Sequence, residues 1–243
     1  MQIKDSVVLI TGAATRVGRQ VALYLAERGA HISFSYYLET EPWQQTLAEI
    51  KALGVKAMAM PVEIRDSAQI KQFVQKTVEH FGKIDVVINS ASIWLKAPFL
   101  EITEADWDLA MDINLKGPFL MAQAVAPYML KQGNGLVINI TDLSAYQLWP
   151  GYAHHGVSKA GLAWLTKAMA LELAPHIRVN AIAPGTVLLP ENAPPEKVKW
   201  AVEKSVLQRV GSPEDVARMA TFLIENDFTT GAVYFVDGGR SLV

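Results

Sequence analysis

Residues 150–159, PGYAHHGVSK, place His155 four positions before Lys159, and Asp142 lies thirteen residues before His155. Side chains four positions apart lie on one face of a helix, so His155 and Lys159 can face the same site. An unperturbed imidazole titrates near pH 6.5, and its protonated form is a competent general acid near neutrality. A neighbouring carboxylate favours that form, whereas a neighbouring ammonium disfavours it. Asp142 and His155 are therefore a candidate proton-donating pair, with Lys159 beside it.

Two other residues of this stretch have alternative interpretations. Tyr152 lies one helical turn before His155 and is either a second candidate proton donor or a ring that packs in the pocket wall. His154 points to a different helical face, where we expect it to be solvated or at an interface. Because His154 and His155 are adjacent rather than four apart, and no further ligand cluster occurs, no metal site is predicted.

A glycine-containing segment near the N-terminus has the form of a phosphate-binding turn. The apolar run 7–10 leads into TGAATRVG, residues 11–18, and a helical pattern follows. Such a turn directs backbone N–H groups and a helix N-terminus at an anion, which predicts a pyrophosphate site. Only Gly12 and Gly18 remain of the three-glycine dinucleotide fingerprint, so an ordinary strand-to-helix turn is the alternative. Arg16 takes the middle position, where its guanidinium either binds a phosphate or is solvated.

The second apolar run bears on which dinucleotide would bind. It ends in SFSYYLE, with no Asp or Glu at Ser35 or Tyr36, where a carboxylate would accept from a ribose 2′-hydroxyl. The absence of that carboxylate, together with Arg16, favours NADPH. Glu39 opposes this choice, because it would repel a phosphate if it turned inward. The sequence predicts NADPH, with NAD as the less favoured alternative.

These groups need a scaffold, and short apolar runs alternate with helical patterns along the whole chain. The alternation predicts βαβ units in an α/β fold, a Rossmann-like doubly wound parallel sheet with helices on both faces. A chain of 243 residues is long enough for one such domain. The apolar runs are 7–10, 31–36, 55–60, 85–89, 136–140 and 177–184. The expected helices are at about 17–29, 40–53, 66–81, 103–131, 152–174 and 212–225.

One segment, residues 185–200, does not follow this alternation of strand and helix patterns. Pro190, Pro194 and Pro195 prevent a continuous helix there until about residue 196. We predict that it is a substrate lid, with Leu188 among its substrate-facing residues.

Composition excludes several classes of function. The formal net charge of −2 and a pI near 6.2 give no general attraction to nucleic acid or to anionic membranes. The absence of cysteine excludes disulfides, thiolate nucleophiles and thiolate metal sites. The first apolar run is too short for a signal-peptide core or a membrane span, so we expect a cytoplasmic protein.

Several motifs occur in a fixed order: TGAATRVG, NSAS (89–92), NLKG (114–117), the pair Ser158 and Lys159, RVNAIAPG (178–185) and VDGG (236–239). Together they resemble the short-chain dehydrogenase/reductase superfamily over nearly the whole chain. Arg16 in the glycine turn, Asp142 in NITDLSAY and the ending DGGRSL are most similar to the pteridine reductases and the related dihydrofolate and dihydromonapterin reductases.

The resemblance implies roles for matching positions. Lys159 would bind the nicotinamide-ribose hydroxyls, Glu63 would lie near the adenine, and Asn114 would hold a helix distortion and a water next to Lys159. Trp94 would stack on a pterin, although it could instead pack in the core or at a subunit contact. The implied cofactor-binding residues are Gly12, Arg16, Val17, Gly18, Tyr36, Glu63, Asn89, Ala91, Ser92, Lys159, Pro184 and Gly185. The implied substrate residues are Trp94, Tyr152 and Leu188, and the other tryptophans are expected to serve packing.

The chain departs from the superfamily at two catalytic positions. Most members have Ser where this chain has Asp142, a change shared with pteridine reductases, and Tyr where it has His155. The resemblance implies an NADPH-dependent reductase of a pterin-type substrate, a dihydropteridine, biopterin or dihydrofolate, with catalytic Asp142, His155, Lys159 and Asn114. The alternatives are a ketone or 3-oxoacyl reductase of the same superfamily and a pseudo-enzyme that only binds NADP(H). The resemblance also implies a homotetramer assembled through the helices at about 103–131 and 152–174 and through the C-terminal segment.

Overall fold

The strand β1, Val7–Thr11, is buried along its whole length. Its alternate side chains enter two separate cores: Val8 and Ile10 pack on one side of the sheet and Leu9 packs on the other. This period of two is the signature of a strand covered on both faces. The structure, a computed structural model that describes residues 1–243, therefore places β1 at the centre of the molecule.

Seven parallel strands form one sheet in the order β3-β2-β1-β4-β5-β6-β7. The other strands are β2 (His31–Tyr36), β3 (Ala57–Pro61), β4 (Val86–Asn89), β5 (Gly135–Ile140), β6 (Ile177–Pro184) and β7 (Val233–Val236). The α-helices are α1 (Arg16–Ala26), α2 (Trp43–Ala52), α3 (Ser67–Phe81), α4 (Glu104–Met111), α5 (Gly117–Gln132), α6 (Ala153–Leu173), α7 (Pro195–Glu203) and α8 (Pro213–Glu225). No helix is both long and apolar enough to cross a lipid bilayer.

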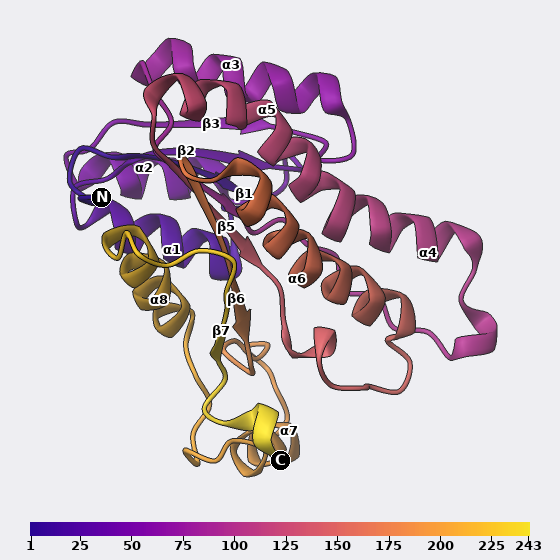
Figure 1. Ribbon diagram of the computed structural model, residues 1–243. Coiled ribbons are helices and arrows are strands. Elements are labelled where there is room, and N and C mark those ends of the chain that lie inside the picture. The colour runs from indigo at the N-terminus through magenta and orange to yellow at the C-terminus, as the bar shows by residue number, and fades with distance from the viewer.

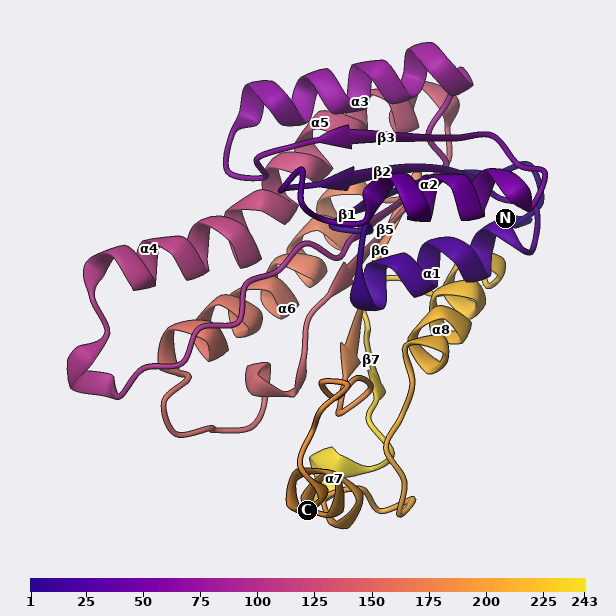
Figure 2. The same cartoon turned by 180° about the vertical axis from the view of Figure 1, so that it is seen from behind.

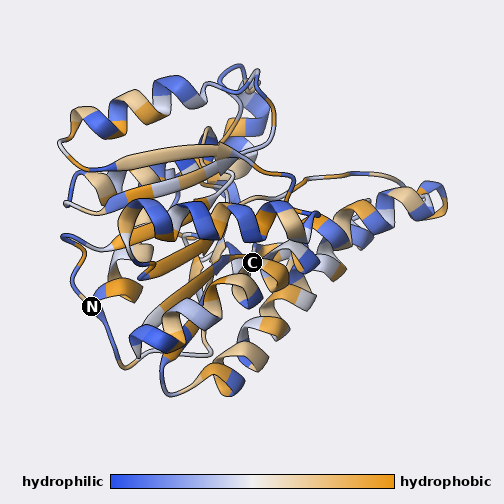
Figure 3. Ribbon diagram, turned by 90° about the horizontal axis from the view of Figure 1, so that it is seen from above, coloured by the Kyte–Doolittle hydropathy of each residue, from blue (hydrophilic) through white to orange (hydrophobic).

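The helices form a layer on each face of the sheet (Figures 1 and 2). Residues of α1 and α8 share one core with β1 and β2, whereas residues of α3, α5 and α6 share the other. Colouring by hydropathy shows mainly apolar strands in the middle and helices that carry both polar and apolar residues around them (Figure 3). The single-domain, doubly wound α/β fold expected from the sequence is therefore confirmed.

The strand order reverses at β1, which pairs with β2 on one side and β4 on the other. Thr11 lies opposite Asn89, and Asn89 lies opposite Asn139, so the carboxyl ends of three strands meet at one edge. The hydroxyl of Thr11 accepts hydrogen bonds from the N–H groups of Ser90 and Ala91, both at 3.0 Å, which ties the loop after β4 to the end of β1. Open α/β sheets bind ligands at such a switch point.

Three differences from the expected elements have local causes. The helix expected over 103–131 is two helices, because a π-helical turn over Asp112–Lys116 separates α4 from α5. The strand β7 was not expected, since its four residues form an edge strand too short for a periodic signal. The predicted lid has an irregular first part and then α7, which begins at Pro195, where a proline fits the first helical position.

Candidate active site

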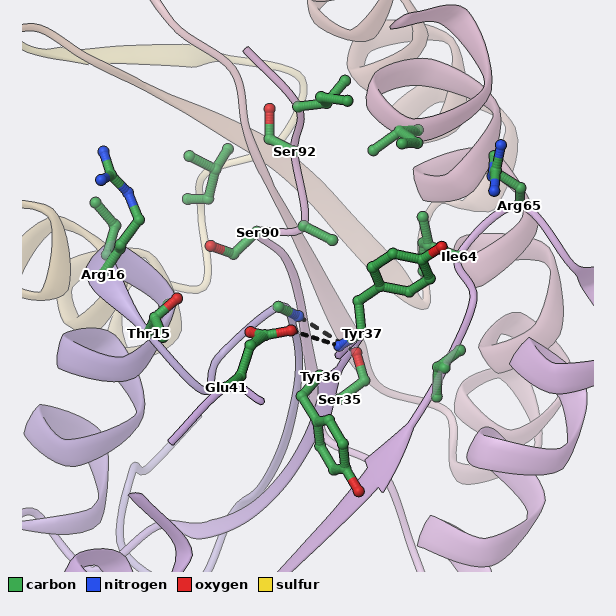
Figure 4. A pocket seen from close by; sticks show the side chains of 18 of the residues that line it. Thr15, Arg16, Ser35, Tyr36, Tyr37, Glu41, Ile64, Arg65, Ser90 and Ser92 are labelled. Carbon is green, nitrogen blue, oxygen red and sulfur yellow. Dashed lines mark hydrogen bonds between the residues drawn. The ribbon is translucent and has the colours of Figure 1, made fainter. Parts of the chain in front are cut away.

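A cavity of about 740 Å³ opens at the carboxyl ends of the central strands (Figure 4). It begins at the glycine turn after β1, passes the end of β2, and reaches the residues that follow β5. Ten of the residues singled out in the sequence line it: Gly12, Arg16, Val17, Gly18, Tyr36, Glu63, Ala91, Ser92, Asp142 and Lys159. One continuous cavity therefore joins the predicted phosphate turn to two of the predicted catalytic side chains.

The glycine turn has the features of an anion site. A Cβ added at Gly18 would lie 2.5 Å from the carbonyl oxygen of Gly12, so only glycine fits there. Arg16 has φ +55°, in the left-handed region that normally favours glycine. The backbone N–H groups of Arg16, Val17 and Gly18 have no acceptor in the protein, because the first bonded amide of the helix is that of Arg19. These free donors at a helix N-terminus fit the pyrophosphate of a dinucleotide.

The carboxylate that the sequence left in doubt, Glu39, is held outside the cavity. It accepts hydrogen bonds from the Tyr36 hydroxyl at 3.0 Å and the Trp43 indole at 3.1 Å. The Tyr36 ring stacks on Trp43 with centroids 4.8 Å apart, and burial with the adjacent Glu39 raises the pKa of Tyr36 to about 12. Glu39 therefore does not oppose a phosphate in the cavity.

A different carboxylate, Glu41, faces the cavity at this point. Its Oε1 accepts a hydrogen bond from the backbone N–H of Tyr37 at 2.9 Å, which Figure 4 shows at the end of β2. It also accepts from the backbone N–H of Leu38 at 2.8 Å. Sequence reasoning missed Glu41, because its loop turns back on itself and no local pattern predicts that turn. The two backbone N–H groups that follow β2 therefore bind the carboxylate of Glu41.

Glu63 lies on the far wall of the cavity and is paired with Arg65. The guanidinium of Arg65 approaches the Glu63 carboxylate to 2.6 Å, and this bond lowers the pKa of Glu63. Neighbouring Val62 and Ile64 supply apolar wall on either side. A flat heterocycle such as adenine would meet both apolar and hydrogen-bonding groups here.

At the other end of the cavity, Lys159 and Asp142 are nearly enclosed. The Lys159 ammonium donates to the carbonyl oxygen of Ile140 at 3.0 Å. Burial lowers the pKa of Lys159, whereas the negative charge of Asp142 acts in the opposite direction and raises it. Asp142 accepts from the backbone N–H of Ser144 at 2.8 Å and also from the Ser144 hydroxyl. Burial alone would raise the pKa of Asp142, but its bond from His155 and the charge of Lys159 hold it below the ordinary value.

His155 lies behind Asp142 and is completely buried. Its Nε2 is 2.7 Å from Oδ2 of Asp142, and its Nδ1 is 3.2 Å from the carbonyl oxygen of Ile93. The predicted Asp142–His155 pair therefore exists as a contact. However, neither ring nitrogen faces the cavity, which corrects the expectation that the imidazole itself meets the substrate. The carboxylate of Asp142 is the part of the pair at the cavity wall.

Asn114 sits in the π-helical turn, where the resemblance implied a helix distortion. Its amide nitrogen donates to the Ile93 carbonyl at 3.2 Å and to the Ser158 hydroxyl at 3.0 Å. Its oxygen accepts from the Ser92 hydroxyl and the Ile93 N–H, both at 2.9 Å. Asn114 thus joins the loop after β4 to helix α6 and makes no direct bond to Lys159.

Aromatic side chains continue the site beyond His155. Trp94 lies 4.4 Å from His155 and 5.1 Å from Tyr152 between ring centroids, and it is 54% exposed. Trp149 follows at 5.6 Å from Trp94. We call Trp94, Trp149 and Tyr152 the aromatic cluster. Leu188, predicted to face the substrate, is partly buried in the loop between β6 and α7 and does not line the cavity.

Four other predicted positions lie elsewhere. The side chain of Asn89 is buried and donates to Asn139 at 2.9 Å, so it faces the neighbouring strand rather than the cavity. Pro184, the last residue of β6, and Gly185, which follows it, lie outside the cavity lining, and the Gly185 N–H donates to the carbonyl oxygen of Val236. His154, expected to be solvated or at an interface, is completely buried inside the chain, and neither of its ring nitrogens has a partner. The expectation failed because α4 packs over the start of α6.

Comparison with known proteins places the chain among oxidoreductases. A family model described as enoyl-(acyl carrier protein) reductase matches residues 12–241. The chain is 37% identical to a 3-oxoacyl-(acyl-carrier-protein) reductase from Thermotoga maritima, over 98% of this chain and 99% of that protein. It is 35% identical to an L-rhamnose 1-dehydrogenase (NAD(P)(+)) from a Sphingomonas species, over 98% and 96% of the two chains.

Solved structures of oxidoreductases also share the fold of this chain. A putative short-chain alcohol dehydrogenase from Sinorhizobium meliloti superimposes with a TM-score of 0.92 at 33% identity, covering 98% of this chain and 97% of that one. Levodione reductase superimposes with the same TM-score at 28% identity, over 99% of each chain. With a dinucleotide-sized cavity at the switch point of the sheet and relatives along its whole length, the chain belongs to the short-chain dehydrogenase/reductase superfamily of oxidoreductases.

Proposed function

We propose that the chain is an NADP(H)-dependent reductase that converts a ketone to an alcohol, with a proton delivered through Asp142 from His155. The observation that carries this proposal is the 2.7 Å contact between His155 and a carboxylate that lines the cavity beside Lys159. A bound NADPH would supply the hydride. The protein must then supply a proton at the oxygen that gains negative charge.

The hydrogen bonds around His155 favour a ring that carries a mobile proton on Nε2. Both amide hydrogens of Asn114 are used by the Ile93 carbonyl and the Ser158 hydroxyl. Nδ1 of His155 can therefore keep its own proton and donate it to Ile93. The pair starts as a carboxylate and an imidazolium: the Nε2 proton passes to Oδ2 of Asp142, and the carboxylic acid formed in this way gives that same proton to the substrate oxygen. The pair ends as a carboxylate and a neutral imidazole, and solvent restores the proton.

Two groups support the choice of NADPH. Arg16 is exposed at the cavity and forms no ion pair with a carboxylate. The N–H groups of Tyr37 and Leu38, which now bind Glu41, are donors that a 2′-phosphate can use when Glu41 moves aside. Glu41 weakens the preference, because its negative charge competes with the phosphate for these donors. We therefore expect NADPH to bind more tightly than NADH, by a margin that Glu41 limits.

The ketone substrate is supported by relatives named as 3-oxoacyl-(acyl-carrier-protein) reductase and putative short-chain alcohol dehydrogenase. One observation favours a second candidate, a pterin-type substrate such as a dihydropteridine, biopterin or dihydrofolate. Trp94 offers an exposed aromatic face within 4.4 Å of His155, where a flat heterocycle would stack. A pterin imine nitrogen is also more basic than a ketone oxygen, which suits a donor other than tyrosine.

A spectrophotometric assay of NADPH oxidation tests the proposal. The panel contains aryl and aliphatic ketones, a 3-oxoacyl thioester, dihydrobiopterin, biopterin and dihydrofolate. Oxidation with ketones or the thioester supports the first candidate, and oxidation with pterins alone supports the second. Tight NADPH binding by calorimetry without turnover of any compound would mean that the chain binds the cofactor as a pseudo-enzyme, and it would overturn both.

A further inference from the structure

Beyond the aromatic cluster lies a cation that the reaction itself does not use. The guanidinium carbon of Arg240 lies 5.2 Å from the ring centroid of Trp149 and 4.8 Å from that of Trp200 on α7. Its Nη1 donates to the hydroxyl of Thr186, and its backbone carbonyl accepts from Gln147 at 3.1 Å. Three segments of the chain, at residues 147–149, 186 and 200, therefore hold Arg240 in one orientation.

The charge of Arg240 has no carboxylate partner. It takes part in none of the ion pairs of the structure, and its Nε and Nη2 atoms have no acceptor. The nearby Asp237 is occupied, because its two carboxylate oxygens accept from the N–H groups of Gly239 at 2.9 Å and Ser241 at 2.7 Å. Burial lowers the pKa of Arg240, and the charges of Asp237 and Asp142 oppose that shift.

A half-buried guanidinium without a counter-ion carries a desolvation cost that an anionic ligand would relieve. Contacts with two tryptophans fix the guanidinium, and its Nε and Nη2 edge matches the two oxygens of a carboxylate or phosphate. The aromatic cluster runs from His155 through Trp94 to Trp149, so one aromatic surface connects the proton-donating pair with Arg240.

We propose that Arg240 forms an oxyanion subsite of the substrate site, and that the enzyme prefers a planar ketone that carries a carboxylate or phosphate at the end remote from its carbonyl. The carbonyl would lie at Asp142, the ring along Trp94 and Trp149, and the anion on Arg240. This substrate class deepens the proposed reductase function and rests on it for turnover, whereas binding at Arg240 can be measured without turnover.

Matched aryl ketones test the subsite. We would measure kcat/KM for 4-acetylbenzoate, its methyl ester and 4-acetylphenyl phosphate, with the unaltered protein and Arg240→Gln. The charged ketones should be preferred over the ester by about ten- to a hundredfold, the usual worth of charge-assisted bonds. Arg240→Gln should abolish that preference and leave the ester unchanged. Lys197→Gln, which removes an exposed positive charge from α7, is the control and should keep the preference.

Calorimetric titration of benzoate and benzamide, with NADP⁺ present, gives a readout independent of turnover. The unaltered protein should bind benzoate at least tenfold more tightly than benzamide, and Arg240→Gln should bind both equally. If no ketone is reduced but this difference appears, the reductase proposal fails and the subsite stands. If ketones are reduced without any preference for charge, the subsite is overturned and the reductase stands.

Arg240 could instead only position the lid through Trp200 and Thr186. In that case Arg240→Gln would lower kcat/KM for the ester as much as for the benzoate, a result that overturns the subsite. Arg240→Lys provides a second variant that retains the charge without the planar edge, and it should keep part of the preference. If Arg240→Gln does not fold, absence of any charge preference in the unaltered protein would equally reject the proposal.

Discussion

Replacement of His155 by glutamine tests whether His155 donates a proton or only holds Asp142 in place by a hydrogen bond. The amide nitrogen of glutamine can reach the position of Nε2 and donate to Asp142, but an amide does not release a proton near neutral pH. A buried carboxylate that lost its partner altogether would cost about 3–5 kcal/mol of stability, which makes phenylalanine the harsher change. Glutamine should therefore preserve the fold and the affinity for NADPH.

Turnover should fall by about 10²–10⁴ in His155→Gln, the usual contribution of a general acid, or about 3–5 kcal/mol in the barrier. His155→Tyr should retain turnover, since a phenol hydroxyl can also donate a proton.

Stopped-flow or steady-state NADPH oxidation, with calorimetric NADPH affinities for each variant, provides the measurement. Full turnover in His155→Gln would refute the relay. If Tyr152→Phe then abolished turnover, the tyrosine hydroxyl one turn earlier would be the donor.

The cofactor preference and the oligomeric state can be tested separately. Arg16→Ala should reduce the preference for NADPH over NADH, because a charge-assisted phosphate contact worth about 1.5–3 kcal/mol is lost; equal dissociation constants for the two cofactors in the unaltered protein would contradict it. Glu41→Gln should tighten NADPH about tenfold and leave NADH nearly unchanged, since a carboxylate and a phosphate about 5 Å apart repel by about 1–2 kcal/mol in water. Light scattering at micromolar concentration should report the expected tetramer rather than a monomer.

Local patterns were enough to predict the scaffold and the backbone turn at Gly12–Gly18. Alternating apolar runs determine a sheet covered on both faces, and the left-handed backbone at Gly12 and Arg16 belongs to a turn that sequence spacing already indicates. The contact between Asp142 and His155 was also predictable, because one residue follows a strand and the other begins a helix on the same edge.

The direction of side chains and the meeting of distant loops were not predictable. The His155 ring faces away from the cavity because the Ile93 carbonyl, supplied by another loop, holds its second nitrogen. Glu41 reaches the cavity through a loop that turns back on itself, and no periodic pattern encodes that reversal. Arg240 contacts Trp149 and Trp200, which are far from it in the sequence, so no local pattern indicates these contacts. From the sequence alone, both tryptophans are expected only to pack.

His154 gives a test of stability that is independent of catalysis. Its imidazole is completely buried with both ring nitrogens unpartnered, and burial lowers its pKa. The unfolded chain therefore binds a proton at this residue at a higher pH than the folded protein does. Stability should decline as pH falls below about 6.5, the ordinary value of histidine.

Replacement of His154 by leucine removes both the unpartnered nitrogens and this titration. Leaving a buried polar group without partners costs about 1–3 kcal/mol, so His154→Leu should raise the free energy of unfolding at pH 7 by up to that amount. The gain should be larger at pH 5.5, because the unaltered protein alone loses stability there. His176→Leu, at an exposed position, is the control and should leave urea unfolding curves unchanged at both pH values. A His154→Leu variant that is less stable than the unaltered protein at both pH values would show that the imidazole has hydrogen-bond partners, such as buried water, and that its burial carries no penalty.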